Sequence, residues 1–223
     1  MIKDFFTSLP RNFIQSFAGR NLWWHFLAIS LTAVIVLTGL DWQYFLAVRN
    51  PVLNSVFMPA LLVGFLLPVL LPLGLLMVGE IRKRRKISVF GAALFQAAAL
   101  GWLISSLCKS FTGRVQPDLL NLAIDSSRNW NFGFWEHGIF WGWPSSHTTV
   151  AFALSVALIV LVGRKRKAIV SMAIIYAFYV GFATSLGIHW LSEFVAGAII
   201  GSVIGVVVGR WWKGKLAEGV GGK

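Results

Sequence analysis

Six long apolar segments constrain this chain more than any other feature of its sequence. They cover residues 22–40, 57–79, 87–108, 148–163, 168–188 and 191–209, and none of them contains Lys, Arg or Asp. A helix needs about 20 mostly apolar residues to cross the hydrocarbon core of a bilayer. The fourth segment reaches that length if its helix starts near Pro144, because proline is well tolerated in a first helical turn. The sequence therefore predicts an all-α fold, a bundle of six transmembrane helices.

The basic residues are distributed unevenly among the stretches that join these segments. Sixteen of the 20 Lys and Arg residues lie before the first segment, in the turns 82–86 and 164–167, and after the sixth segment. These stretches share one side of a six-helix bundle, and an excess of Lys and Arg marks the cytoplasmic side. Both termini are therefore predicted to be cytoplasmic. The formal net charge of +12 is then explained by the basic residues on the cytoplasmic side. Nucleic acid is therefore not an expected partner.

The chain is predicted to form one membrane-embedded domain over residues 1–223. The charge pattern favours a bacterial-type plasma (inner) membrane, although a protein of the endoplasmic reticulum would have a similar pattern. Residues 1–21 suit an amphipathic helix on the membrane surface, with an apolar face made of Phe5, Phe6, Phe13, Ile14 and Phe17. Residues 109–146 form a long non-cytoplasmic loop. Its four tryptophans argue against disorder, and they suit either the headgroup level or a functional loop.

Polar residues that are far apart in the sequence gather on the predicted non-cytoplasmic face. Lys and Arg neutralise phosphoryl oxygens, and the free N–H groups at the start of a helix bind anions. This combination predicts a phosphate site on that face. Its residues are Lys109 and Arg114 after the third segment, Ser145, Ser146 and His147 at the start of the fourth, and His189 and Glu193 around the start of the sixth.

Two histidines and one carboxylate of this set can carry the chemistry. His189 is a candidate nucleophile towards phosphorus, and His147 is a candidate proton donor to the leaving oxygen. Glu193 lies four residues after His189, so it can hold one tautomer of the ring if a helix includes both residues. Two His and one Glu also suit a metal ion, but no compact ligand motif is present, so no metal and no cofactor is expected.

Three short motifs in these regions resemble the signature of a known family. They are similar to K-x6-R-P, P-S-G-H and S-R-x5-H-x3-D of the integral-membrane type 2 phosphatidic acid phosphatases, which are relatives of soluble bacterial acid phosphatases and vanadium haloperoxidases. Their order and their shared side of the membrane indicate membership of that family. The matching stretches are Lys109-Ser-Phe-Thr-Gly-Arg-Val-Gln-Pro117, Pro144-Ser-Ser-His147 and His189-Trp-Leu-Ser-Glu193.

The resemblance implies a role for each matching residue. It implies that His189 forms a phosphohistidine, that His147 is the general acid, and that Glu193 replaces the aspartate that orients the nucleophile. It also implies that no metal is needed. The candidate phosphate ligands are then Lys109, Arg114, Ser145, Ser146 and Gln116.

Two cations of the family's phosphate site are absent from this chain. Gln116 stands in place of the arginine of R-P, and the S-R pair falls on Phe182 and Ala183. Because they share the predicted face of the site, we expect Arg114, with Arg128 as a second candidate, to compensate. One oriented charge donor is worth roughly 10²–10³ in rate, so a site without such replacements would be slow.

The expected function is hydrolysis of a lipid phosphate or diphosphate at the non-cytoplasmic membrane face through a phosphohistidine. The expected partners are the lipid phosphate and the bilayer. Two alternatives stay open. One is a lipid phosphotransferase that uses the same nucleophile, and the other is a catalytically weak lipid-binding or lipid-flipping protein that keeps the fold.

Overall fold

The computed structural model describes residues 2–118 and 123–218, and within these ranges the chain is helical with no strand. The all-α prediction is therefore confirmed. The only ladder-type contact in the described part is an isolated antiparallel bridge between Arg114 and Trp130. The helices are α1 (Ile2–Phe17), α2 (Asn21–Leu37), α3 (Leu40–Ala47), α4 (Pro51–Ile81), α5 (Arg85–Thr112), α6 (Ser146–Val162), α7 (Lys167–Ser185) and α8 (Leu191–Glu218).

Four helices, α4, α5, α7 and α8, are long and apolar enough to cross a membrane. The pair α1 and α2 passes the same test together, with a bend of 58° between them, and α6 is a shorter apolar helix of 17 residues. The chain is therefore an integral membrane protein with four or five candidate spans by length and composition. The predicted number of six spans is not confirmed by this criterion.

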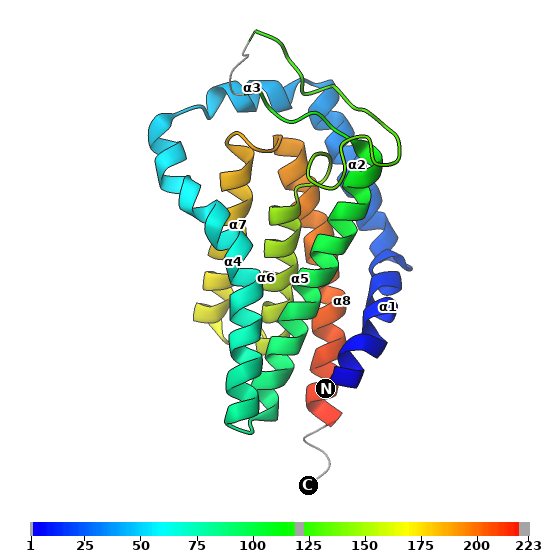
Figure 1. Ribbon diagram of the computed structural model, residues 1–223, viewed down its shortest axis with the longest axis vertical. Helices are drawn as coiled ribbons and strands as arrows, with labels where there is room; N and C mark the ends of the chain where they lie inside the picture. Colours follow the sequence, from blue (N-terminus) through cyan, green and yellow to red (C-terminus); the bar gives the residue numbers. More distant parts are fainter. Residues whose placement is uncertain (1, 119–122, 219–223) are drawn as a thin grey trace.

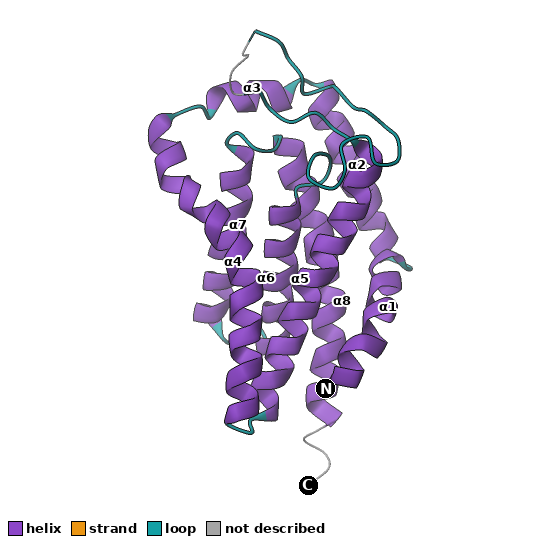
Figure 2. Cartoon of the chain, viewed as in Figure 1, coloured by secondary structure: helices purple, strands orange, loops and turns teal. Residues whose placement is uncertain are grey.

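The bundle has two different ends (Figure 1). Helices α4 to α8 run along the long axis, whereas α3 lies across one end, which the loop after α5 also covers (Figure 2). The turns that join α4 to α5 and α6 to α7 lie at the opposite end, together with the last turn of α8. The predicted segregation of the basic turns from the long loop is thus present in the fold.

Helices α6 and α8 pack closely because α8 presents glycine to α6 at every fourth position. A Cβ atom at Gly205 would lie 2.6 Å from the Ala153 carbonyl oxygen, and one at Gly201 would overlap the Thr149 carbonyl. Small residues at this spacing let two backbones approach within a membrane. The contact aligns the start of α6 with the start of α8, which is where the candidate site lies. The glycines are Gly197, Gly201, Gly205 and Gly209.

Helix α1 is held against α5 and α8 by a buried amide network, which we define as Ser8, Asn12, Gln96 and Trp212. The Gln96 side-chain oxygen accepts from Asn12 Nδ2 at 2.8 Å and from Trp212 Nε1 at 3.0 Å. Its amide nitrogen donates to the Ser8 hydroxyl and to the Phe5 carbonyl, both at 2.9 Å. All four donor and acceptor positions of this amide are thus used.

The side chains of α1 are divided between the core and the exterior. Phe5, Phe13 and Phe17 pack against the core of the bundle. Phe6 and Ile14, which belong to the same predicted apolar face, are 67% and 64% exposed on the outside of the bundle. The difference arises because α1 packs lengthwise on α5 and α8, so only one stripe of its apolar side chains meets protein. The placement of residues 1–21 at the membrane surface stays a prediction.

Candidate active site

His189 lies in the short turn between α7 and α8, next to the carboxylate of Glu193. Its backbone N–H donates to the Thr184 carbonyl at 2.9 Å, which ties the turn to the end of α7. Glu193 lies in the first turn of α8 and is fully buried. The His189 Nδ1 and Glu193 Oε2 atoms are 2.6 Å apart. The structure thus brings together the candidate nucleophile and the residue expected to orient it.

His147 is the second residue of α6, and Ser145 caps the start of this helix. The Ser145 hydroxyl oxygen accepts hydrogen bonds from the Thr148 hydroxyl at 3.0 Å and from the Thr148 N–H at 3.5 Å. The Ser145 N–H donates to the Glu193 carbonyl at 3.2 Å, which joins the starts of α6 and α8. Ser145 is therefore a helix cap, and its contact with phosphate stays a prediction.

Lys109 enters the site from the last turns of α5, so it belongs to this helix and not to the loop that was predicted to begin there. Its side chain is buried, and its ammonium donates to the Phe140 carbonyl at 3.2 Å. The Lys109 charge acts on both His147 and His189. An ammonium has three donors, so the bond to Phe140 leaves donors for a phosphate.

Ser146, the first residue of α6, is tied to α5. Its hydroxyl oxygen accepts a hydrogen bond from the Ser105 hydroxyl at 3.0 Å. This bond fixes the start of α6 against the last third of α5, one turn before Lys109. A contact between the Ser146 side chain and phosphate stays a prediction.

Arg114 is fully buried, and protein groups hold its guanidinium. Its Nη2 donates to Asp41 Oδ2 and to the Ser127 carbonyl, both at 2.6 Å, and its Nη1 donates to the Ser192 hydroxyl at 2.7 Å. Nη1 also lies 3.5 Å from Glu193 Oε1. The guanidinium thus spans two carboxylates. Its contact with phosphate stays a prediction, and this geometry does not favour it.

Gln116 stands where the family motif has an arginine, and its amide lies against Glu193. In one orientation of the amide, Nε2 donates to Glu193 Oε1 at 3.4 Å. In the opposite orientation, the nitrogen donates to the Ile188 carbonyl at 2.5 Å and to Glu193 Oε2 at 3.3 Å, and it lies 3.0 Å from His189 Nδ1. The oxygen then accepts from the Gly142 N–H at 3.3 Å. Gln116 therefore shares the carboxylate with His189 and Arg114 in either orientation, and its predicted role as a phosphate ligand stays a prediction.

Arg128, the second candidate for compensation, lies at the end of α2. Its Nη2 donates to the Leu37 carbonyl at 3.1 Å, where a positive charge complements the helix dipole. No contact within residues 2–118 and 123–218 joins Arg128 to His189 or Lys109. Its role at a phosphate stays a prediction as well.

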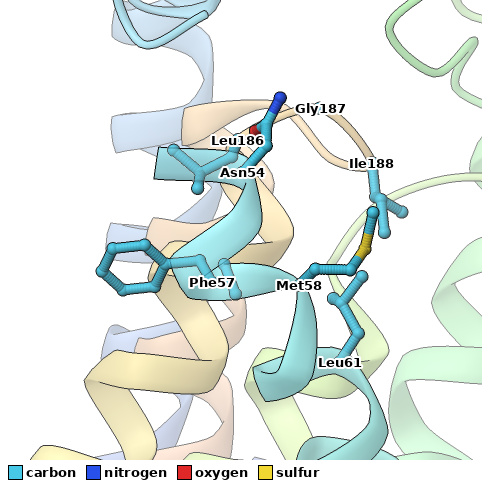
Figure 3. A pocket seen from close by; sticks show the side chains of 8 residues that line it. Asn54, Phe57, Met58, Leu61, Leu186, Gly187 and Ile188 are labelled. Carbon is cyan, nitrogen blue, oxygen red and sulfur yellow. The ribbon is translucent and has the colours of Figure 1, made fainter. Parts of the chain in front are cut away.

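An apolar cavity of about 90 Å³ lies between α4 and the segment that leads from α7 to His189 (Figure 3). One of its lining residues is Ala183, the position at which the family motif has its second arginine. Here the chain offers an apolar wall where that motif has a charge. The full lining is Asn54, Phe57, Met58, Leu61, Ala183, Leu186, Gly187 and Ile188.

Burial lowers the pKa of His189, and the positive charge of Lys109 lowers this pKa further. Glu193 opposes the shift through its hydrogen bond and its charge, but the net direction is downward. His189 is therefore neutral near physiological pH. Because the Glu193 carboxylate accepts the proton on Nδ1, the lone pair of the neutral ring resides on Nε2.

The site combines a neutral imidazole oriented by a carboxylate, a buried ammonium and a second histidine at the start of a helix. These are parts that bind an anion and move a proton to or from it. Within the described residues, no group of three or more His, Cys, Asp or Glu side chains is placed to hold a metal ion.

The comparisons with known proteins concern the fold and the family of the chain. The chain is similar to a crystal structure described as the first transmembrane PAP2 type phosphatidylglycerolphosphate phosphatase from Bacillus subtilis, with a TM-score of 0.56 and 20% sequence identity over 85% of this chain and 94% of that chain. At this identity, the likeness concerns the fold alone. No curated protein matches the sequence. The family model of the PAP2 superfamily matches residues 90–216, more than half of the chain and all three motifs. The chain therefore belongs to the PAP2 superfamily.

Proposed function

We propose that this protein is a membrane lipid phosphatase that hydrolyses a lipid phosphate or diphosphate through a phosphohistidine at His189. The 2.6 Å contact between His189 Nδ1 and Glu193 Oε2 carries the proposal. A carboxylate that holds the proton on Nδ1 leaves Nε2 ready to attack, and it stabilises the charge that forms on the ring. The fold of a transmembrane PAP2 type phosphatase supports a lipid phosphate as the substrate.

The phosphate is bound by Lys109 and by the start of α6. Lys109 neutralises a phosphoryl oxygen, and the first N–H groups of α6 donate to the others with the help of the helix dipole. Ser145 keeps that helix start in place through its cap. The burial of Lys109 strengthens its attraction for an anion, because little water screens the charge.

The reaction proceeds in two displacements at phosphorus. Nε2 of His189 forms a bond to phosphorus while the bond from phosphorus to the lipid oxygen breaks. His147 gives a proton to that leaving oxygen. Water then attacks the phosphohistidine, His147 takes a proton from this water, the N–P bond breaks, and inorganic phosphate leaves. None of these steps needs a metal ion.

The lipid chain lies along α4, at the apolar cavity between α4 and the segment that leads to His189. Ala183 and Ile188 give this cavity an apolar wall, and Ile188 directly precedes the nucleophile in the chain. The tail of a membrane lipid is already surrounded by hydrocarbon, so such a wall admits the alkyl part of a substrate without a cost in exposure while its phosphate reacts.

The site faces the non-cytoplasmic side, because the basic turns 82–86 and 164–167 occupy the opposite end of the bundle (Figure 1). An excess of basic residues marks the cytoplasmic side. Helix α6 is enclosed by α5, α7 and α8 and crosses the membrane with them. Together with α4 and the bent pair α1–α2, this gives six spans.

The test is phosphate release by detergent-purified protein from a panel of lipid monophosphates and diphosphates, with and without EDTA. We expect release that persists in EDTA and is lost in His189→Gln. Gln43→Ala is the matched control, because Gln43 is exposed on α3 and its loss should leave release unchanged. Release that survives in His189→Gln would overturn the proposed mechanism. Labelled phosphate that passes only to an added alcohol or lipid acceptor would instead identify a transferase.

A further inference from the structure

Asp41 is a buried carboxylate that the proposed reaction does not use. It lies in the first turn of α3 and is fully buried. Its Oδ1 accepts from the Ser192 N–H at 2.8 Å. Its Oδ2 accepts from the Ser192 hydroxyl at 2.7 Å and from Arg114 Nη2 at 2.6 Å. A carboxylate placed fully out of solvent must be paired in this way, because an unpaired buried charge is very costly.

The contact with Ser192 fixes the start of the helix that carries Glu193. The first N–H groups of a helix lack partners within it, and Asp41 supplies one from α3, with a negative charge that favours this end of the helix. Ser192 immediately precedes Glu193 and follows His189 by three residues. Asp41 therefore sets the position of the segment on which the His189–Glu193 pair is built.

The contact with Arg114 sets the charge next to Glu193. Arg114 lies between the two carboxylates, with Nη2 on Asp41 and Nη1 3.5 Å from Glu193 Oε1. The guanidinium is also stacked on the Trp130 ring, with its carbon 4.6 Å from the ring centroid. Without Asp41, Arg114 would keep its bonds to Ser127 and Ser192 but lose the carboxylate that balances its charge on one side. Its charge would then be drawn towards Glu193 and compete with His189 for that carboxylate.

We propose that Asp41 is a positioning residue which, through Arg114 and Ser192, holds Glu193 in the orientation that keeps the proton of His189 on Nδ1. Asp41 contacts neither His189 nor the phosphate-binding groups. Arg114 then serves the site from within the protein instead of contacting phosphate. This inference rests on the proposed function for its kinetic consequences, but its spectroscopic consequence does not depend on turnover.

The direct test is nitrogen NMR of the full-length protein in detergent, with ¹⁵N-labelled histidine. The chain has four histidines, and loss of one signal in His189→Gln assigns that of His189. The chemical shifts report which ring nitrogen carries the proton and the midpoint of titration. His189 faces Lys109 of α5, His147 of α6, Arg114 of the loop and Glu193 of α8, so a change in the Arg114–Glu193 contact reaches it.

We expect the wild-type His189 to carry its proton on Nδ1. In Asp41→Asn, we expect a larger share of the Nε2–H tautomer and a titration midpoint at lower pH, because a negative charge is lost and Glu193 is drawn to Arg114. Gln43→Ala lies two residues further along the same helix at an exposed position and should show the wild-type spectrum. Loss of the partner that orients a metal-ligating histidine typically costs 10–100-fold in activity. By analogy, we expect kcat of Asp41→Asn to fall by about that factor while KM changes little.

Ser192→Ala provides a second, milder variant. It removes the hydroxyl that joins Asp41 to Arg114 but keeps both charges and the backbone contact. We expect a shift of the His189 signals in the same direction and a smaller fall in kcat. If Asp41→Asn does not fold, Ser192→Ala still tests whether the contacts of Asp41 position Glu193 and His189.

A folded Asp41→Asn or Ser192→Ala protein with the wild-type tautomer, midpoint and kcat would overturn the inference and leave the proposed function intact. A wild-type protein that releases no phosphate would overturn the proposed function instead, and the NMR comparison would still decide the role of Asp41. A purely structural role would lower thermal stability without moving the His189 signals.

Discussion

Two buried polar clusters lie in this bundle, and they differ in how completely their hydrogen-bonding capacity is used. The amide network of Ser8, Asn12, Gln96 and Trp212 is neutral, and every donor and acceptor of the Gln96 amide has a protein partner. The cluster of Lys109, Arg114, His147, His189 and Glu193 contains charged groups. There, the Lys109 ammonium retains donors beyond its bond to Phe140, and His189 retains its second ring nitrogen.

The comparison separates the groups that hold the fold from those that serve the chemistry. The amide network fixes the packing of α1, because its members form hydrogen bonds with one another. The Gln96 amide therefore has no free donor or acceptor for a ligand. A cluster with a neutral imidazole, an incompletely used ammonium and a helix start can bind an anion and react with it. Substitutions in the amide network should therefore change stability alone, and those in the charged cluster should change turnover.

After loss of the nucleophile itself, the largest difference between the clusters should come from His147→Asn. If His147 protonates the leaving oxygen, its loss should lower kcat for an alkyl lipid phosphate by about 10²–10⁴-fold. With p-nitrophenyl phosphate, whose leaving group needs little protonation, the fall should be much smaller. The two substrates compared on one protein preparation provide the control. An equal loss for both would show that His147 does not act as the acid.

The next largest effect is expected from Lys109→Met. Methionine keeps much of the side-chain volume but removes the buried charge, so phosphate binding and kcat/KM should fall by roughly 10²–10³-fold. Arg128→Met is the matched control, because Arg128 contacts the end of α2. Steady-state kinetics on both variants would measure this. A greater loss of kcat/KM in Arg128→Met than in Lys109→Met would show that Arg128, and not Lys109, is the cation that binds phosphate.

The charged cluster should also determine how kcat/KM depends on pH, and this effect should be smaller. His189 attacks when neutral, so activity falls as the pH drops through its pKa, and burial places this pKa below the ordinary value of 6.5. The acid limb of kcat/KM for p-nitrophenyl phosphate should therefore have its midpoint below pH 6.5. In Lys109→Met, loss of a positive charge should move this midpoint upward. A wild-type midpoint above 6.5 would contradict the account.

At the other extreme, Gln96→Leu in the amide network should have no effect on turnover. The change leaves Asn12 and Trp212 without their acceptor, and each such orphaned group costs about 1–3 kcal/mol. We expect a lower midpoint of thermal unfolding with unchanged kcat per folded molecule. Gln43→Leu makes the same substitution at an exposed position and should change neither quantity. A tenfold fall in the kcat of Gln96→Leu would contradict the assignment of the amide network to stability alone.

The sequence was sufficient to predict that Lys109, His147, His189 and Glu193 gather at one end of the bundle. Apolar segments and the distribution of basic residues place all four on one side of the membrane, and the spacing of four residues places His189 and Glu193 within reach of each other. The segment boundaries were less accurate. Helix α4 begins at Pro51, six residues before the predicted span, because Asn50 caps it through the Val52 N–H.

The partner of Arg114 was not predictable from the sequence. Asp41 lies 73 residues away in the chain, in a helix that follows the first apolar segment and was not anticipated. Asp41 belongs to a helix that lies across the end of the bundle, and Arg114 belongs to a loop. Sequence periodicity predicts contacts within one helix or strand, so it could not predict this pair. The signal that remained was chemical: Asp41 is one of eight acidic residues and borders an apolar span, where an unpaired charge would be costly.

The most direct test of the central claim is to trap the covalent intermediate on His189. Purified protein is mixed with the best lipid phosphate from the panel, quenched in alkali, in which phosphohistidine is stable, and digested for peptide mass analysis. The account predicts one added phosphoryl group on the peptide that contains His189 in the wild-type protein, and none in His189→Gln. Turnover with no phosphoryl group on His189, or with the group on another residue, would contradict it.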